Sequence, residues 1–117
     1  MFRILCKSKI MNAIITSKDL QYSGSIGIDK TIIEASDIMI GEQVHVLNVN
    51  NGERFTTYVI EEKADSGKIV LYGPAARKGD IGDGLVILTY CMLESKECHN
   101  FSIKKIFLAK NNQYKNK

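Results

Sequence analysis

The chain of 117 residues has no tryptophan, one proline, two histidines and three cysteines. No pair among Cys6, Cys91 and Cys98 has the spacing of metal ligands, so we expect reduced thiols and no metal site. With two histidines, a serine–histidine–aspartate hydrolase is hard to build. No apolar run approaches the roughly 18 residues that cross a bilayer, and the N-terminus lacks the apolar segment of a signal peptide. We therefore expect a cytoplasmic protein without a membrane segment.

The composition is that of an ordinary globular protein. Hydrophobic residues make up 44% and charged residues 25% of the chain, which we expect to form a single domain over residues 1–117. The net charge of +3 is mild and no basic stripe is interleaved with aromatic residues, so nucleic acid is not an expected partner. Residues 110–117 are polar without periodicity and predict a frayed tail.

Short β-branched and aromatic runs separated by turn residues predict a mainly β fold with six or seven strands. The runs are residues 2–10, 11–16, 42–50, 54–60, 68–72, 85–93 and 102–109, with a shorter β-like run at 26–28. Asn51-Gly52 predicts a type I′ turn, whose two central positions need positive φ. Residues 17–20 predict a turn or a short helical corner.

Two short helices are expected between the strands. Asp29 is the predicted N-cap of a helix over residues 30–37. Pro74 opens the predicted second helix, over residues 73–77, because proline is favoured in the first helical turn. Few long connections and short strands together favour a small β-barrel over a βαβ sheet.

The stretch Tyr22-Ser23-Gly24-Ser25 joins two apolar runs and carries a candidate nucleophile. Gly24 has no Cβ and can take backbone angles that other residues avoid. The Ser25 hydroxyl could attack the carbonyl on its own N-terminal side, which would cleave the chain. Gly-Ser is also a common turn dipeptide, so this stretch taken alone favours a plain turn.

Four separated places in the chain form a more specific pattern. They are Lys9, Tyr-Ser-Gly-Ser at 22–25, Asn-Gly-Glu-Arg-Phe-Thr-Thr-Tyr at 51–58 and Gly-Pro-Ala-Ala-Arg at 73–77. With these motifs, residues 1–93 resemble the bacterial aspartate 1-decarboxylases, a pyruvoyl-dependent family. The resemblance implies a small six-stranded double-psi β-barrel with two short helices. It also implies a homotetramer whose active sites lie between adjacent subunits.

The resemblance further implies that the chain is a precursor that cleaves itself between Gly24 and Ser25. The Ser25 hydroxyl would attack the Gly24 carbonyl to give an ester, and elimination and hydrolysis would leave a pyruvoyl group at position 25. The products would be a short chain of residues 1–24 and a long chain of residues 25–117. The implied reaction is the decarboxylation of L-aspartate to β-alanine, for pantothenate synthesis.

The residue chemistry is compatible with that reaction. Decarboxylation of an α-amino acid leaves a carbanion, and the ketone of a pyruvoyl group is an electron sink that no ordinary side chain supplies. Arg54 can hold a substrate carboxylate through two parallel hydrogen bonds, Lys9 can add a positive charge, and Tyr58 can donate a proton. The family implies that Thr57 stabilises the oxyanion during cleavage. Strict alternation places Thr57 on the opposite strand face from Arg54 and Tyr58, so a bulge or a second subunit would have to bring them together.

Substrate binding is expected from Thr57 and from the start of the second predicted helix, at Gly73, Ala75 and Ala76. The backbone N–H groups of the two alanines are free at a helix start, for substrate or for cleavage. Pro74 has no N–H group and can contribute none.

Three residues depart from the usual family pattern. Met11 stands where a histidine is usual, Leu47 where a tryptophan is frequent, and Tyr72 where an asparagine is expected to position the cleavage site or the substrate. Tyr72 is larger than asparagine and offers only a hydroxyl. Cleavage is therefore expected to be slow, to rely on Thr57 alone, or to need a helper protein, and the sequence leaves these alternatives open.

Two other interpretations compete with the decarboxylase. An unprocessed barrel could act as a binding module for a small acid, and it would differ from the enzyme in one covalent bond, Gly24–Ser25. A nucleic-acid-binding barrel is the third interpretation, and the mild charge argues against it.

Overall fold

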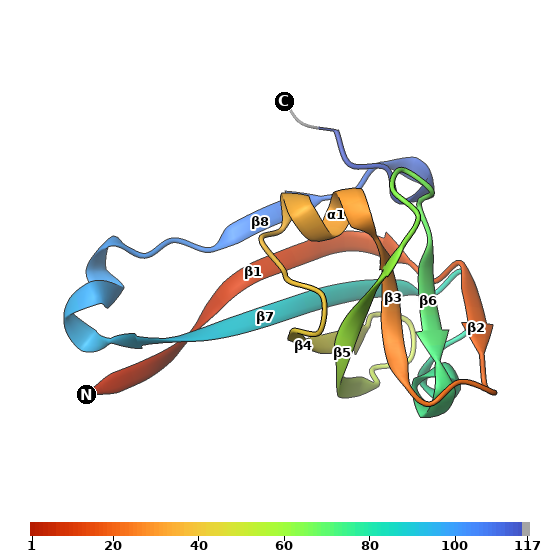
Figure 1. Ribbon diagram of the computed structural model, residues 1–117, viewed down its shortest axis with the longest axis horizontal. Coiled ribbons are helices and arrows are strands. Elements are labelled where there is room, and N and C mark those ends of the chain that lie inside the picture. The colour runs from red at the N-terminus through yellow and green to blue at the C-terminus, as the bar shows by residue number, and fades with distance from the viewer. Residues whose placement is uncertain (116–117) are drawn as a thin grey trace.

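The computed structural model describes residues 1–115 and is mainly β (Figure 1). Eight strands form one curved sheet in the order β2-β6-β3-β5-β4-β7-β1-β8. The strands are β1 (Phe2–Ile14), β2 (Ser17–Asp19), β3 (Ser25–Asp29), β4 (Gln43–Asn48), β5 (Arg54–Glu62), β6 (Ile69–Tyr72), β7 (Gly84–Glu94) and β8 (Lys104–Phe107). The connections contain one α-helix, α1 (Lys30–Ala35), and three 3₁₀ helices, η1 (Gly73–Lys78), η2 (Ser95–Asn100) and η3 (Lys110–Asn112).

The sheet curls into a small barrel because the chain passes from β1 directly into β2. β1 lies near one end of the strand order and β2 at the other. Between them, Thr16 donates its backbone N–H to the Ile69 carbonyl of β6 at 2.8 Å, and β2 continues that pairing in parallel as far as Tyr72. The small, mainly β barrel predicted from the sequence is therefore confirmed, with eight strands in residues 1–115 where six or seven were expected and four short helices where two were expected.

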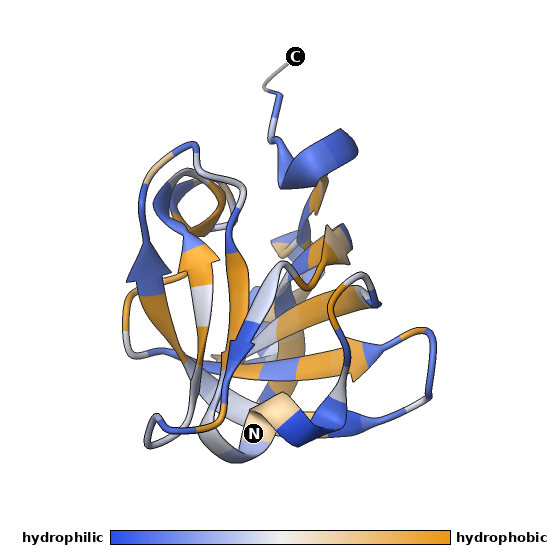
Figure 2. Cartoon of the chain, turned by 90° about the vertical axis from the view of Figure 1, so that its right-hand side faces the viewer, coloured by the Kyte–Doolittle hydropathy of each residue, from blue (hydrophilic) through white to orange (hydrophobic). Residues whose placement is uncertain are grey.

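Alternating side chains fill the barrel. In β4, Val44 and Val46 are fully buried, whereas Gln43, His45 and Leu47 lie on the outer face. Figure 2 shows hydrophobic residues concentrated on the strands and hydrophilic residues on the connecting loops. Burial of these apolar side chains is the main favourable term in folding.

Both predicted short helices are present. Asp29 caps α1, as expected, because its carboxylate accepts the Thr31 N–H at 2.8 Å. The same buried carboxylate also accepts the N–H groups of Asp65 and Gly67, so it ties α1 to the turn before β6. The second helix, η1, is a 3₁₀ helix that begins one residue before Pro74.

Three local predictions were wrong. Residues 2–14 form one strand rather than two, because a bulge at Asn12, with φ of 65°, absorbs the irregularity. Residues 17–19 are strand β2 rather than a turn. Of the Asn51-Gly52 pair only Gly52 has positive φ, so the turn is not type I′. The Asn48 side chain accepts the N–H groups of residues 50 and 51, which stabilises a longer loop.

The tail predicted to be frayed is ordered in its described part. Asn112 is 1% exposed. Its amide group donates to the carbonyls of Ile14 and Gly67, and its side-chain oxygen accepts the Ile14 N–H, each at 2.8 Å. One polar residue of this segment, Asn112, therefore serves a buried hydrogen-bond network. Residues 116–117, the end of the predicted tail, lie outside the described residues.

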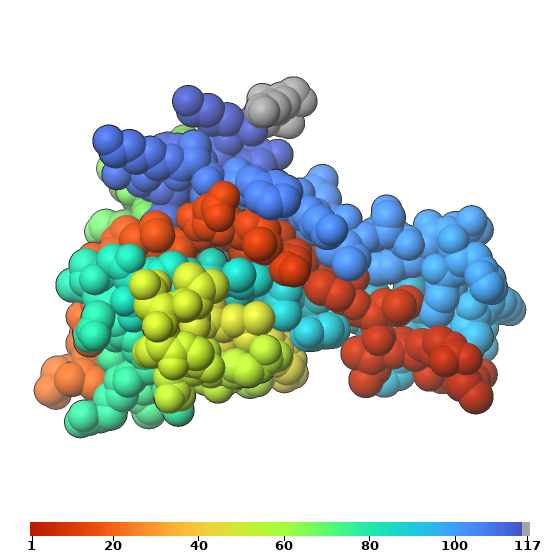
Figure 3. Space-filling model, turned by 180° about the vertical axis from the view of Figure 1, so that it is seen from behind, coloured from red at the N-terminus to blue at the C-terminus, as the bar shows by residue number. Residues whose placement is uncertain are grey.

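The paired ends of β1 and β7 project from the barrel as a ribbon that leads to η2 (Figure 3). Phe2, Ile4 and Met92 are each more than 60% exposed on this ribbon. Within residues 1–115, no helix is both long enough and apolar enough to span a membrane.

Replacing Asn112 with glycine tests the role of the tail. Glycine accepts the positive φ of 55° at this position, so the change mainly removes the side-chain hydrogen bonds. We expect Asn112→Gly to lower the free energy of unfolding by about 2–4 kcal/mol in urea denaturation. The exposed neighbour provides the control, because Lys110→Ala should change stability by less than about 0.5 kcal/mol. Equal stability of the two variants would contradict the network.

Candidate active site

Ser25 occupies the boundary between an irregular loop and a buried strand. It is the first residue of β3 and pairs with Tyr72 of β6. Gly24, immediately before it, has φ of 124°, a region that residues with a Cβ rarely adopt. The backbone therefore enters β3 through a conformation that glycine makes accessible.

The Ser25 hydroxyl is buried without a partner. The residue is 0% exposed, and its Oγ is the one buried side-chain nitrogen or oxygen within residues 1–115 that lacks a hydrogen bond. A buried hydroxyl without a hydrogen bond costs about 1–3 kcal/mol, so such groups are rare and call for an explanation. An oxygen whose lone pairs are free is suited to act as a nucleophile.

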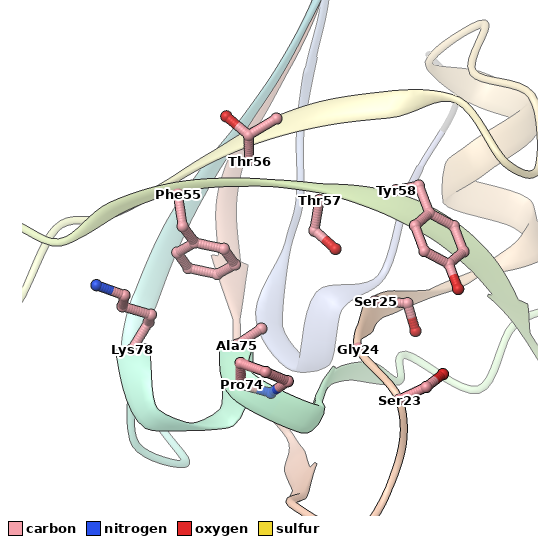
Figure 4. Close-up of a pocket in the computed structure, with 10 residues that line it drawn as sticks. All are labelled: Ser23, Gly24, Ser25, Phe55, Thr56, Thr57, Tyr58, Pro74, Ala75 and Lys78. Atoms are coloured by element: carbon pink, nitrogen blue, oxygen red, sulfur yellow. The ribbon is translucent and has the colours of Figure 1, made fainter.

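A pocket of about 420 Å³ lies over this serine (Figure 4). Three segments that are far apart in the sequence line it: the loop before β3, the middle of β5 and the start of η1. The lining residues are Ser23, Gly24, Ser25, Phe55, Thr56, Thr57, Tyr58, Pro74, Ala75 and Lys78. In Figure 4, Thr57 and Tyr58 project from β5 toward Ser25, and Thr56 points away.

Thr57 and Tyr58 reach the same pocket without a bulge. β5 pairs with β4 in continuous register from Arg54 to Tyr58, so neighbouring side chains do alternate between its faces. In the parallel pairing of β3 with β5, Ile26 lies beside Val59, which places Ser25 beside Tyr58. β3 begins only at Ser25, so the part of β5 before Tyr58 has no β3 residue paired with it. At this point Thr57 and Gly24 line the same pocket.

The two predicted cations lie elsewhere in this chain. Arg54 begins β5, is exposed and does not line the pocket. Lys9 lies on β1, opposite Leu88 of β7 and Lys105 of β8. Lys9 does not line the pocket either. Within one chain, therefore, neither cation is brought to Ser25.

Of the predicted residues in η1, Ala75 lines the pocket and Ala76 is buried away from its lining. Gly73 packs directly against the backbone of the loop that precedes Ser25. A Cβ built on Gly73 would lie 2.6 Å from the Tyr22 carbonyl oxygen and 2.7 Å from the Gly24 nitrogen. Close packing, together with a φ of 63°, therefore requires glycine at this position.

Tyr72 directs its hydroxyl away from the pocket. The hydroxyl donates to Glu62 Oε2 at 2.6 Å, and the ring lies 4.7 Å from the Tyr22 ring between centroids. Burial, and then the hydrogen bond to the Glu62 carboxylate, raise the pKa of Tyr72 to about 12. The phenol therefore stays protonated at neutral pH. Met11 and Leu47, the other two departures from the family pattern, are half-buried and do not line the pocket.

Sequence reasoning did not assign Phe55, Lys78 or Ser23 to the site. Phe55 lies within the motif of residues 51–58, and Ser23 within that of residues 22–25, so both could have been found by their neighbours. Lys78 ends η1 and pairs with Glu53 at 2.9 Å, which places a cation at one end of the pocket. No sequence signal singled it out.

Comparison with known proteins gives a consistent result. The family described as aspartate decarboxylase matches residues 1–115. The aspartate 1-decarboxylase of Thermoanaerobacter pseudethanolicus is 46% identical over 97% of both chains. That of Syntrophomonas wolfei is 45% identical over 98% of both, and that of Coxiella burnetii is 56% identical over 75% of this chain and 79% of its own.

Two glycines with positive φ provide a matched test of the packing behind the site. Gly41 has φ of 91°, and a Cβ there would have no atom within 4 Å. A Cβ on Gly73 would instead collide with backbone atoms. We expect Gly41→Ala to cost about 1 kcal/mol and Gly73→Ala about 3 kcal/mol or more in urea denaturation. Both should be made in a Ser25→Ala background, which removes the candidate nucleophile and so leaves packing as the one property under test. Equal losses would show that η1 can move away from the loop.

Proposed function

The chain belongs to the aspartate decarboxylase family, and on this premise we propose that it is a lyase that converts L-aspartate to β-alanine and carbon dioxide. The observation that supports this function in the site is the buried, unpartnered Ser25 hydroxyl directly after Gly24. A buried serine with no structural hydrogen bond is a suitable precursor for a covalent group derived from its own side chain. The product β-alanine suits the pantothenate synthesis implied by the family resemblance.

We infer that Ser25 is converted to the pyruvoyl group. Its Oγ attacks the Gly24 carbonyl carbon, the Gly24–Ser25 C–N bond breaks, and an ester and a free Ser25 amine result. Elimination removes the Ser25 α-proton and the Gly24 carboxylate, which leaves dehydroalanine. Addition of water and loss of ammonia then give the pyruvoyl group at position 25, with chains 1–24 and 25–117. Thr57, beside Gly24, is suited to stabilise the oxyanion.

The residues around position 25 fit this group. When present, the pyruvoyl ketone supplies the electron sink for decarboxylation. Tyr58 lines the pocket and precedes Val59, the β5 partner of Ile26, which supports Tyr58 as the proton donor to the carbon that loses carbon dioxide. Phe55 and Ala75 contribute apolar surface to the same pocket.

We further propose that the active site is shared between copies of the chain in a homotetramer. Aspartate has two carboxylates, and the predicted cations Lys9 and Arg54 lie outside the pocket of their own chain. A neighbouring copy could bring them to it. The exposed apolar residues on the β1–β7 ribbon offer a surface for such a copy to cover. A helper protein for maturation and a cytoplasmic location stay predictions.

Replacing Ser25 with alanine tests the cleavage chemistry. We expect Ser25→Ala to give an intact, folded chain with no decarboxylase activity, because it lacks the attacking oxygen. Ser102→Ala removes an exposed hydroxyl outside the pocket and serves as the control. Denaturing mass spectrometry of the wild type and of the control should show two fragments, divided between Gly24 and Ser25, with the longer one lighter than a free-serine chain by one ammonia. Carbon dioxide release by Ser25→Ala would disprove the mechanism.

An uncut, inactive wild-type chain that binds aspartate would favour the small-acid-binding module instead. Isothermal titration calorimetry with L-aspartate would distinguish that outcome, since a binding module retains its affinity without any pyruvoyl group.

Variants of Thr57 and Tyr58 should distinguish the chain-cleavage step from the decarboxylation step. We expect Thr57→Val to slow chain cleavage by about 10²- to 10³-fold, because an oxyanion donor is lost. We expect Tyr58→Phe to cleave normally and to lower kcat, per pyruvoyl group, by about 10²- to 10⁴-fold. Cleavage is followed by intact mass and turnover by β-alanine formation. If either variant affected only the other stage, its assigned role would be wrong.

A further inference from the structure

Three adjacent strands next to the scissile bond present Tyr72, Gly27 and Glu62 on one face. β3 lies between β6 and β5 (Figure 1). Ser25 of β3 pairs with Tyr72 of β6, and Asp29 of β3 pairs with Glu62 of β5. Gly27 lies midway between Ser25 and Asp29, and residues two apart in a strand share a face. The tyrosine and the glutamate therefore flank Gly27 from opposite sides.

The Tyr72–Glu62 hydrogen bond crosses β3 at this glycine. The two outer strands are two spacings apart, about 10 Å, a distance that only long side chains can bridge. The bond is 2.6 Å long, in the short range of hydrogen bonds between a hydroxyl and a carboxylate. Its donor and acceptor are both partly shielded from water.

Gly27 provides the space for this bridge. Its φ is not positive, so the backbone does not demand glycine. A Cβ at this position would lie 2.9 Å from Tyr72 Cε2 and would collide with the Glu62 carboxylate. The three residues therefore fit one another, and a side chain at position 27 would displace the bridge.

The Tyr72 ring also contacts the segment that leads to the scissile Gly24–Ser25 bond. The Tyr22 ring contacts the Tyr72 ring at 4.7 Å and an interplanar angle of 45°. Tyr22 lies three residues before Ser25, and its own side chain is about half exposed. The orientation of the Tyr72 ring therefore restrains Tyr22 and the loop that leads to Ser25.

We propose that Glu62 is a positioning residue for cleavage of the Gly24–Ser25 bond and acts through Tyr72. By holding the Tyr72 hydroxyl across Gly27, it fixes the ring that supports Tyr22, and with it the approach of the Ser25 oxygen to the Gly24 carbonyl. Glu62 touches neither reacting atom. This inference rests on the proposed function, because it concerns the maturation of the same site.

The test is the first-order rate of precursor cleavage, followed by denaturing mass spectrometry. Tyr72→Phe keeps the ring and removes the hydroxyl, Glu62→Leu removes the acceptor, and Glu62→Gln keeps a carbonyl acceptor. We expect the first two changes to slow cleavage about tenfold each, since misorientation of reacting groups is costly. We expect Glu62→Gln to stay within about threefold of the wild type. The double variant Glu62→Leu/Tyr72→Phe should be no slower than either single one, because both remove the same bond.

Asn112→Gly, which should be less stable but lies outside this bridge, is the control for stability and should cleave at the wild-type rate. If Glu62→Leu fails to fold, the contrast between Tyr72→Phe and Glu62→Gln decides. Two results would overturn the inference and leave the proposed decarboxylase activity unaffected. One is cleavage of both Tyr72→Phe and Glu62→Leu at the wild-type rate, and the other is a double variant slowed by the product of the two single effects. A wild-type chain that is neither cleaved nor active would instead overturn the proposed function, and the inference with it.

Discussion

The close approach of Gly73 to the backbone of Tyr22 and Gly24 is the contact on which the site depends. Two backbone segments can lie this near only if no Cβ stands between them. Their contact places the loop against η1 and sets the point at which β3 begins. Because β3 begins at Ser25, the serine is buried by the barrel, and its hydroxyl finds no partner. Packing around a glycine thus produces the one unpaired buried side-chain oxygen in the part of the chain that the structure describes.

Features with local causes could be predicted from the sequence. The Asp29 cap needs only its own carboxylate and the next two residues. The strands of the barrel follow from β-branched runs and turns, and the motifs at 22–25, 51–58 and 73–77 all contribute to one pocket. The place of Thr57 and Tyr58 was left open, because alternation is local whereas the start of the neighbouring strand is not.

The errors have a common physical origin in partners distant along the chain. Asn112 is polar and near the C-terminus, and it is buried because Ile14 and Gly67 offer backbone groups that it satisfies. Asn12 permits a bulge that keeps β1 continuous beside β7. Tyr72, whose effect on cleavage the sequence left open, bonds to Glu62 on another strand. Periodicity and motif spacing contain no information on any of these pairings.

The position of β1 has a consequence for the integrity of the molecule. This strand belongs to the segment before Gly24, and it pairs with β7 over most of its length and with β8 in parallel. Its residues Ile10 and Ala13 are fully buried in the common core. A cut before Ser25 would therefore divide the covalent chain without separating its parts. Residues 1–24 would stay bound through β1 as a non-covalent subunit. A single translated polypeptide would thus become a heterodimer whose two chains share one sheet and one core.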